Sequence, residues 1–418
     1  MARPAKTVAG ISVAVAAALA LTACGGGGGA QQSADAKQTL TVWGMGEEAK
    51  RLATVAKDFE KDNPNITVKV TPIGWDVVGQ KMTAAAAAGK LPDMAQMGST
   101  MMGQYIALDV LEPVNTKTFK KSDFFPATWN SNVVDGTAYG VPWYADVRGL
   151  YYRTDLAEKA GIDKAPVTWD DHHKLAEAYQ KNGAQYGTAL QPGNTGAWQS
   201  WLQFLYSEGG SLTDADGKAA LDSPEAVKAF RTWGSYFKDG LAKKNFVPGA
   251  DVAKTFAKGE EPTFMSGPWM VQNLNEQQPQ LKGKWKTAPL PAGPKGSVSW
   301  VGGASLVTFK DSEHKAAAEK FTQYLTTPET QAAWYGATKS LPANKAAYDL
   351  PEIKDSAEAD SLKVFRQALD TGKEIPALEK WNEIAAAIEG TLEKIAQGGD
   401  PAAEAKKLQA TTEGLISQ

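Results

Sequence analysis

Residues 141–153 bring aromatic rings and charges of both signs into one short stretch, Val-Pro-Trp-Tyr-Ala-Asp-Val-Arg-Gly-Leu-Tyr-Tyr-Arg. Most of these residue types favour β-structure, and the proline fixes the backbone near the start. A carboxylate and a guanidinium between rings suit a neutral ligand with many hydroxyl groups, because charged groups form directional hydrogen bonds and rings pack on C–H faces. A solvated ion pair beside core aromatic residues explains the same composition, and this stretch alone does not separate the two interpretations.

A single strand over this stretch would divide its side chains between two faces. It places Trp143, Val147 and Tyr151 on one face, and Tyr144, Asp146, Arg148 and Tyr152 on the other. Asp146 and Arg148 are therefore candidates for hydrogen bonds to a ligand. Trp143 and Tyr144 are candidates either for the wall of a cleft or for rings at a hinge.

The N-terminus predicts export and lipid anchoring. Two basic residues precede an apolar run over 8–21 that is too short for a membrane span. The Leu-Thr-Ala-Cys sequence that ends at Cys24 resembles the lipobox of bacterial lipoproteins, which implies cleavage before Cys24 and lipidation of its thiol. We expect residues 1–23 to be a signal peptide and the glycine-rich segment 24–38 to be a flexible tether. The protein is then expected at the outer face of the cell membrane.

The elements that must position the candidate residues form an α/β pattern. A chain of 418 residues is longer than one typical domain and favours two lobes. Its net charge of −3 and lack of a basic run argue against nucleic-acid binding. Residues 39–97 alternate strand, helix, strand, helix, strand, which is typical of a parallel sheet. Ligands bind beyond the carboxyl ends of such strands, so Glu47, Gly98, Ser99 and Thr100 are candidate ligand contacts.

Several tryptophans could line a cleft between the lobes. Trp269 follows a Gly-Pro turn at the start of a predicted helix, where a large exposed ring is best explained by a ligand. Trp198 and Trp201 are three residues apart on another predicted helix, so at most one of them faces the cleft, and we favour Trp198. We expect stacking on such rings to supply most of the apolar burial of a ligand.

A second strand that could cross between lobes is predicted over 298–310. It carries Trp300 and the adjacent glycines Gly302 and Gly303, which we include among the candidate ligand contacts. Near the C-terminus, Trp381 begins a predicted helix after a proline-containing segment. Its ring is a further candidate for stacking, although neighbouring residues could simply bury it.

Enzymatic chemistry finds little support in the sequence. His172 and His173 are adjacent on a predicted helix and cannot face one ligand, and His314 lies far from both in sequence. Clustered metal ligands are not evident, so we expect neither a metal nor a cofactor. A lipid-anchored glycoside hydrolase would also place carboxylates among tryptophans, but carboxylates on two hinged lobes would keep a fixed separation poorly.

Short motifs that occur in a fixed order connect the chain to a known family. They are Thr-Val-Trp-Gly at 41–44, Asn-Pro-Asn-Ile-Thr-Val at 63–68, Leu-Pro-Asp at 91–93, Tyr-Gly-Val-Pro at 139–142 with Leu-Tyr-Tyr-Arg at 150–153, Asp-Ser-Pro-Glu-Ala at 222–226, Met-Ser-Gly-Pro-Trp at 265–269 and Thr-Pro-Glu-Thr-Gln at 327–331. Together with the lipobox, they resemble the extracellular solute-binding proteins that include maltose-binding protein and the sugar-binding lipoproteins of ABC importers. The resemblance covers essentially the whole mature chain.

The resemblance implies a periplasmic-binding-protein-like clamshell of class II type, with two α/β lobes and three crossings between them. The implied N-terminal lobe comprises 39–144 plus 302–343, and the C-terminal lobe comprises 145–301 plus 344–418. Two of the crossings match the stretches near 141–148 and 298–304 described above. The third, near 340–347, is implied by the resemblance only.

The resemblance also implies roles for individual residues. Glu47 and Asp146 match acidic residues that contact sugar hydroxyls, while Trp269 and Trp381 match rings that stack on sugars. The loop Gly-Ser-Thr at 98–100 lacks the Trp and Asp of the maltose-binding relative, which argues against maltose itself.

The implied function is that of a lipid-anchored, monomeric protein that binds a di- or oligosaccharide. By hinge closure it would deliver this ligand to an ABC permease pair and its ATPase. A binding protein of the same fold for a peptide or a polyamine is the main alternative.

Overall fold

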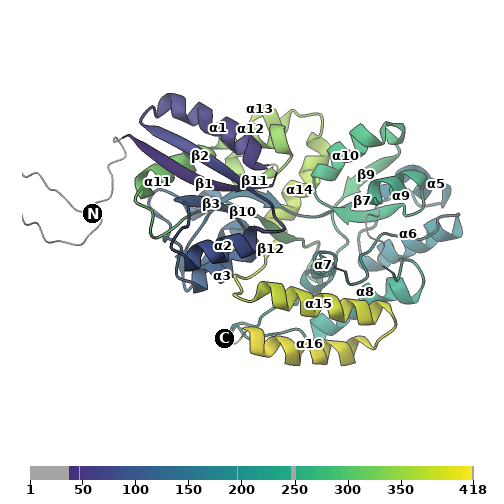
Figure 1. The fold of residues 1–418 in the computed structure, drawn as a ribbon. Coiled ribbons are helices and arrows are strands. Elements are labelled where there is room, and N and C mark those ends of the chain that lie inside the picture. Colours follow the sequence, from purple (N-terminus) through teal and green to yellow (C-terminus); the bar gives the residue numbers. More distant parts are fainter. Residues whose placement is uncertain (1–36, 47, 195, 246–250, 417–418) are drawn as a thin grey trace, which may run out of the picture.

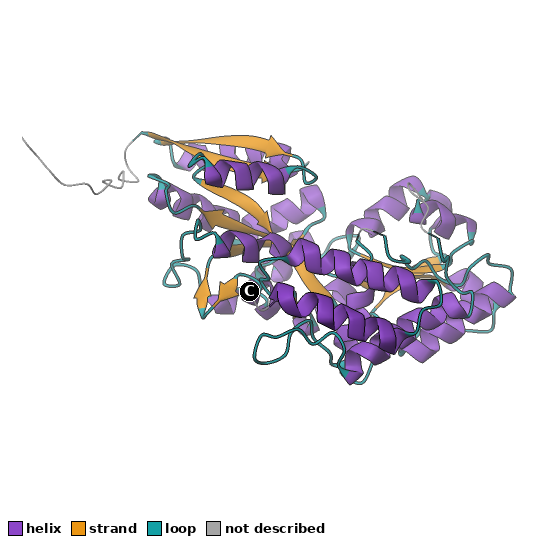
Figure 2. Cartoon of the chain, turned by 60° about the horizontal axis from the view of Figure 1, so that its bottom comes forward, coloured by secondary structure: helices purple, strands orange, loops and turns teal. Residues whose placement is uncertain are grey.

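The computed structural model describes residues 37–46, 48–194, 196–245 and 251–416. The predicted signal peptide, Cys24 and Glu47 lie outside these residues. The described chain forms two lobes, each built around its own sheet (Figure 1). When the molecule is turned so that its bottom comes forward, the strands gather in two separate places with helices around each (Figure 2). The expected two-lobed α/β clamshell is therefore confirmed.

The N-terminal lobe contains the larger sheet, with strand order β11-β6-β10-β3-β1-β2 and β12 paired to β10. Its strands are β1 (Gln38–Met45), β2 (Ile66–Ile73), β3 (Met94–Gly98), β6 (Val141–Asp146), β10 (Trp300–Thr308), β11 (Leu341–Pro342) and β12 (Lys373–Glu374). Strand β1 is parallel to β2 and β3, as the alternating pattern predicted. Strand β10 runs antiparallel to both β3 and β6.

Helices cover this sheet and complete the lobe (Figure 1). They are α1 (Glu48–Asp62), α2 (Val78–Ala87), α3 (Met102–Ala107), α4 (Pro126–Asn130), α11 (Lys315–Leu325), α12 (Pro328–Thr338) and α13 (Pro351–Lys354), with a small hairpin of β4 (Val133–Val134) and β5 (Thr137–Ala138). Helix α1 buries Leu52, Ala56 and Phe59 at helical spacing, so its apolar stripe faces the sheet. Strand β1 continues to Met45, because its pairing with β2 extends to Ile73.

The C-terminal lobe contains a three-stranded sheet of order β8-β7-β9 and most of the remaining helices. Its elements are β7 (Gly149–Arg153), β8 (Thr263–Ser266), β9 (Trp285–Ala288), α5 (Thr154–Lys159), α6 (Trp169–Lys181), α7 (Trp198–Glu208), α8 (Pro224–Lys238), α9 (Val252–Lys258), α10 (Trp269–Gln277), α14 (Ala359–Thr371), α15 (Trp381–Ala396) and α16 (Pro401–Ile416). Helix α8 begins at Pro224, because the side chain of the preceding residue, Ser223, accepts a hydrogen bond from the Ala226 N–H.

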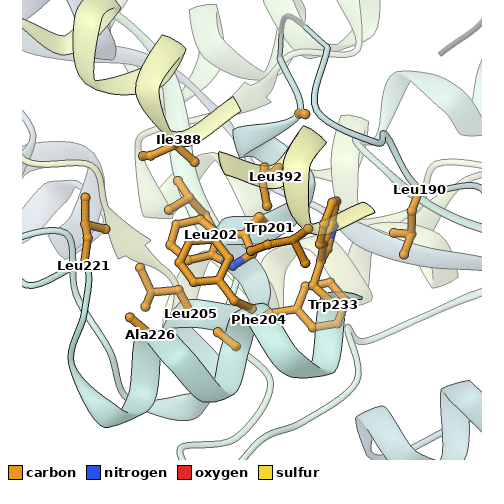
Figure 3. Close-up of a cluster of buried hydrophobic side chains, with 14 of the residues drawn as sticks. Leu190, Trp201, Leu202, Phe204, Leu205, Leu221, Ala226, Trp233, Ile388 and Leu392 are labelled. Atoms are coloured by element: carbon orange, nitrogen blue, oxygen red, sulfur yellow. The ribbon is translucent and has the colours of Figure 1, made fainter. Parts of the chain in front are cut away.

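The main core of this lobe lies between α7, α8 and α15 (Figure 3). Trp201 stacks on Phe230 with ring centroids 4.2 Å apart, and Leu392 of α15 belongs to the same cluster. Trp201 is fully buried here, whereas Trp198, one turn earlier on α7, is only partly buried. Burial of one face of α7 therefore leaves its first turn available to the cleft.

The stretch 141–153 is not the single strand that we predicted. Strand β6 ends at Asp146 in the larger sheet, and β7 begins at Gly149 in the smaller one. The predicted alternation of faces is interrupted within β6 by a bulge at Trp143, because Tyr144 and Pro142 pair with the consecutive residues Ala304 and Ser305. It ends at 147–148, where the chain changes sheets. Tyr152 consequently packs in a C-terminal-lobe cluster with Leu175 and not beside Tyr144.

The crossings between the lobes are packed into one buried cluster, which we call the hinge core. It includes Ala145, Val147, Tyr151, Val301, Leu341 and Phe365. Strand β11 joins it by pairing with β6, so the chain near 340–347 lies beside the first crossing. The junction of the lobes is thus a side-chain core and not a set of solvated linkers.

Candidate functional site

A cavity of about 510 Å³ lies between the two lobes, and we call it the central cavity. It is lined by Glu48, Trp75, Gly98, Ser99, Thr100, Tyr144, Ala145, Asp146, Trp198, Gln199, Pro268, Trp269, Trp300, Gly302, Gly303, Thr338, Lys339 and Ser340. These residues come from the carboxyl ends of strands in the larger sheet, from α7 and α10 of the C-terminal lobe, and from the crossing strands. The cavity therefore lies where the topology of an α/β sheet places a ligand.

Trp269 forms the wall on the side of the C-terminal lobe. It is the first residue of α10, directly after the Gly267-Pro268 turn that ends β8, and 41% of the residue is exposed. Its ring folds back over Gly267, where an added Cβ would lie 1.9 Å from the Trp269 Cζ3 atom. Only glycine leaves room for this close approach, so the local sequence determines where the ring lies.

Trp75 forms a wall on the side of the N-terminal lobe. It lies in the loop between β2 and α2, and 43% of the residue is exposed. Its ring lies beside Gly98, where an added Cβ would be 3.3 Å from the Trp75 Cζ3 atom. Two half-exposed indole rings from different lobes thus line one cavity, an arrangement suited to the apolar faces of a ligand.

Arg148 holds the Trp269 wall in place from behind. Its guanidinium lies between the rings of Trp269 and Trp300, with its carbon 4.9 Å and 4.5 Å from their centroids. One Nη donates to Asp146 Oδ1 and the other to Gln199 Oε1, each at 2.7 Å. The predicted Asp146–Arg148 pair exists, but Arg148 is buried and does not line the central cavity. It supports the residues that do.

Oxygen atoms from α1 and β6 of the N-terminal lobe lie around the central cavity. Asp146 and Glu48 contribute carboxylates, and Tyr144 contributes a hydroxyl that accepts a hydrogen bond of 3.1 Å from Gln96 Nε2. Burial raises the pKa of Tyr144 far above its ordinary value, and the nearby charges of Glu48 and Asp146 raise it further. The phenol is therefore neutral, and the site offers hydrogen-bond acceptors to hydroxyl or amine donors.

A cationic group completes the lining at the end of α12. Lys339 adopts a left-handed backbone conformation with φ of +59°, and its Nζ pairs with Glu358 at 2.9 Å. Thr338 and Ser340 flank it on the cavity wall. Because the Lys339 charge already has a carboxylate partner, this corner does not favour an anionic ligand strongly.

The crossing strand β10 supplies the floor of the central cavity. Trp300, Gly302 and Gly303 all line it, and the indole N–H of Trp300 donates to the Gln199 carbonyl at 2.9 Å. The ring of Trp198 lies 5.3 Å from that of Trp300. These predicted residues are brought together with Gly98, Ser99, Thr100, Tyr144, Asp146 and Trp269.

Two predicted tryptophans lie elsewhere. Trp143 is 1% exposed and packs in the core of the N-terminal lobe, with its ring 4.5 Å from that of Trp334, because its position in β6 faces away from the cavity. Trp381 is 4% exposed and packs edge-on against Trp198 with centroids 5.0 Å apart. Its first-turn position on α15 directs it into the C-terminal-lobe core and toward a neighbouring cavity shared with Trp75 and Thr100.

The sequence interpretation missed Trp75, Glu48, Gln199 and Lys339. A signal for Trp75 was available, because it follows β2, which is parallel to β1, and the rule that selected residues after β1 and β3 applies equally there. Glu48 stands beside the predicted Glu47, which lies outside the described residues. Gln199 and Lys339 carried no signal, since neither belongs to a recognisable motif.

Groups of three or more His, Cys, Asp or Glu side chains arranged to hold a metal ion do not occur in the part of the chain that the structure describes. Within the same residues, every helix is too short or too polar to cross a membrane.

Comparison with known proteins agrees with this architecture. The family profile for bacterial extracellular solute-binding proteins matches residues 54–360. The maltodextrin-binding protein MdxE of Bacillus subtilis is 28% identical over 371 residues, which is 84% of this chain and 84% of that protein. The diacetylchitobiose-binding protein DasA of Streptomyces coelicolor is 25% identical over 400 residues, covering 92% of this chain and 91% of that protein.

Among solved structures, the sugar-binding protein MalE of Xanthomonas citri superimposes with a TM-score of 0.84 at 33% identity. The superposition covers 91% of this chain and 98% of MalE. Family, relatives and fold agree with one another and with the two-lobed cavity described above. The chain therefore belongs to the bacterial extracellular solute-binding proteins, a family of binding proteins and not of enzymes.

Proposed function

We propose that this protein binds a di- or oligosaccharide in the central cavity. The observation that carries the proposal is the pair of half-exposed rings, Trp75 and Trp269, that line one cavity from different lobes together with the carboxylates of Glu48 and Asp146. Sugars present C–H faces that pack on indole rings and hydroxyl groups that donate to carboxylates. Relatives whose names specify maltodextrin, diacetylchitobiose and galactooligosaccharide support the same ligand class.

The proposed mechanism is hinge closure. A saccharide that contacts both rings gains more interactions when the lobes are closed, so it shifts the population toward the closed form by that difference in affinity. Trp198, Trp300, Gly302, Gly303, Tyr144 and the loop 98–100 would form the remaining contacts. The closed protein would then dock on an ABC permease pair driven by its ATPase.

The proposed location is the outer face of the cell membrane. Lipidation of Cys24 and the tether up to residue 38 would hold a monomeric body there. Cys24→Ser is expected to move the protein from the membrane fraction to the soluble fraction of the producing cells. Retention of this variant in the membrane would refute the anchor.

A thermal unfolding assay of the purified protein against a panel of sugars, peptides, polyamines and metal salts tests the ligand class. Binding to the native state raises the unfolding midpoint by mass action. We expect a shift with a subset of di- and oligosaccharides. A shift with peptides or polyamines alone would replace the sugar assignment by another solute.

A further inference from the structure

Gln199 lines the central cavity from the first turn of α7, and both its backbone and its side chain are held by neighbours. Its backbone carbonyl accepts a hydrogen bond of 2.9 Å from the indole N–H of Trp300. Its side-chain Oε1 accepts a hydrogen bond of 2.7 Å from Arg148, which is buried at the first crossing between the lobes. The carboxamide of Gln199 is therefore kept in one orientation before a ligand binds.

The contact with Arg148 also determines which end of this carboxamide is left for a ligand. A guanidinium has only hydrogen-bond donors, so the amide atom that faces it must be the oxygen and not the nitrogen. In the part of the chain that the structure describes, no group accepts a hydrogen bond from Gln199 Nε2. The residue is partly exposed, and Nε2 is not one of the described side-chain atoms that are buried without a partner. Its N–H groups are therefore available as donors.

The other terminal nitrogen of Arg148 holds Asp146, whose Oδ1 accepts a hydrogen bond at 2.7 Å. One guanidinium thus fixes a carboxylate, which can only accept, and an amide that has only its donor left, and both groups line the central cavity. A hydroxyl group matches this pair, because it donates and accepts at the same time. An ammonium group can only donate and would meet the amide N–H, whereas an anionic carboxylate can only accept and would meet Asp146.

We propose that Gln199 is a specificity-determining residue of the central cavity. Its Nε2 donates a hydrogen bond to a hydroxyl oxygen of the ligand, while Asp146 accepts one from the same hydroxyl group or from its neighbour. This proposal rests on the proposed function. The amide and the carboxylate together select a hydroxyl group over an ammonium group or a carboxylate at this position of the ligand.

Binding calorimetry with two matched variants tests the proposal. Gln199→Glu keeps the size of the side chain and the oxygen that faces Arg148, and it replaces the donor by a second acceptor. Gln277→Glu, at an exposed position near the end of α10, adds the same charge to the same lobe and is the control. The probes are maltose, galactobiose and diacetylchitobiose, each with its monodeoxy and aminodeoxy analogues. Any other sugar that raises the wild-type unfolding midpoint is tested with its own analogues.

We expect Gln199→Glu to bind the parent sugar about tenfold more weakly, as for the loss of one hydrogen bond. The unfolding temperature without ligand should be unchanged or higher, because the contact with Arg148 becomes an ion pair. In the wild type, removal of one particular hydroxyl group should weaken binding by about tenfold or more, and in Gln199→Glu this ratio should be about tenfold smaller. The aminodeoxy analogue at the same position should bind Gln199→Glu better than the wild type. Gln277→Glu should behave like the wild type throughout.

Other outcomes overturn the proposal. Unchanged affinity of Gln199→Glu for every sugar that the wild type binds would show that Nε2 donates to no ligand. A lower affinity with the same ratio of parent sugar to analogue in both proteins, for every analogue, would mean that the variant acts through packing and not through this hydrogen bond. Absence of any sugar binding by the wild type would refute the proposed function, and this proposal with it, before any variant is compared.

Discussion

The two half-exposed tryptophans that line the central cavity from different lobes are held in different ways. Trp269 is fixed by covalent and non-covalent neighbours: it begins a helix, lies over Gly267 and stacks on Arg148. Trp75 lies in a loop, and its ring lies beside Gly46 and Gly98. Both rings are exposed to nearly the same extent, at 41% and 43%.

Two rings that are equally exposed can therefore differ in how far they are preorganised for a ligand. A ring that is already immobile loses little conformational entropy when a ligand packs on it, whereas a loop residue must be ordered at that moment. We therefore expect the C-terminal wall to supply more of the binding free energy than the N-terminal wall.

The largest expected effect concerns how acid changes the stability of the two lobes. His172 lies behind β8, with Nδ1 2.8 Å from the Tyr236 hydroxyl and Nε2 3.4 Å from Thr263 Oγ1. Burial, together with a smaller contribution from the charge of His173, lowers the pKa of His172 from its ordinary value of 6.5 to about 3. The folded state thus favours neutral His172. The free energy of unfolding is therefore independent of this group above pH 6.5 and falls as the pH decreases from 6.5 toward 3, by up to about 5 kcal/mol.

The N-terminal lobe should respond to acid at a lower pH than the C-terminal lobe. Burial opposes ionisation of Asp93, at the start of β3, but hydrogen bonds from Thr41, Ser312 and His314 outweigh it and lower the pKa below 3.8. That contribution is lost only below about pH 4. Urea unfolding should therefore show that the free energy of unfolding decreases from pH 7 to pH 4. We expect His172→Gln to make this decrease smaller and His173→Gln to leave it largely unchanged. An identical decrease in the wild type and in His172→Gln would contradict this assignment.

Removing the fixed ring should have the next largest effect. Trp269→Ala is expected to weaken sugar binding by about 2–4 kcal/mol, as for the loss of a preorganised aromatic anchor. Calorimetry with the sugar that shifts the unfolding midpoint measures it. An unchanged dissociation constant would show that Trp269 does not contact the ligand.

Removing the loop ring should cost less. Trp75→Ala is expected to weaken binding by about 1–2 kcal/mol, because part of the gain from stacking is offset by ordering of the loop. The same titration, run beside Trp269→Ala, gives the comparison directly. If Trp75→Ala proved the more damaging variant, immobility of the ring would not be what distinguishes the two walls.

The smallest effects should come from the glycines beneath the rings. Gly267→Ala places a Cβ 1.9 Å from Trp269 Cζ3 and must displace the ring, so we expect about tenfold weaker binding. Gly98→Ala places its Cβ at 3.3 Å from Trp75 Cζ3, and a small movement of the loop relieves that contact. We expect less than a threefold change there, provided that calorimetric unfolding shows both variants folded.

Local chemistry explains which parts of the site could be predicted from the sequence. Trp269 was predictable because a Gly-Pro turn before a helix determines its surroundings within four residues. The parallel order of β1, β2 and β3 followed from alternating strands and helices. Trp75 was predictable from the same order, because it follows the carboxyl end of β2, where ligands of parallel sheets bind.

Other residues depended on contacts that no local pattern encodes. Strict alternation placed Trp143 and Tyr144 on opposite faces, but a bulge in β6 at Trp143 interrupts it, and both rings pack against one core cluster of the N-terminal lobe. Arg148 was expected to contact the ligand, yet its guanidinium is enclosed by Trp269 and Trp300, which are more than 100 residues away in sequence. Gln199 is an ordinary helix residue until the fold places a cavity beside it.

The hinge core has an implication for how this protein can change over evolutionary time. Val147, Tyr151, Val301 and Phe365 are buried where the chain passes between the lobes, and none of them lines the central cavity. Altered packing there would favour the open or the closed arrangement, and apparent affinity scales with the fraction of molecules competent to bind. Selection could therefore adjust the concentration at which the protein responds while leaving its choice of ligand untouched.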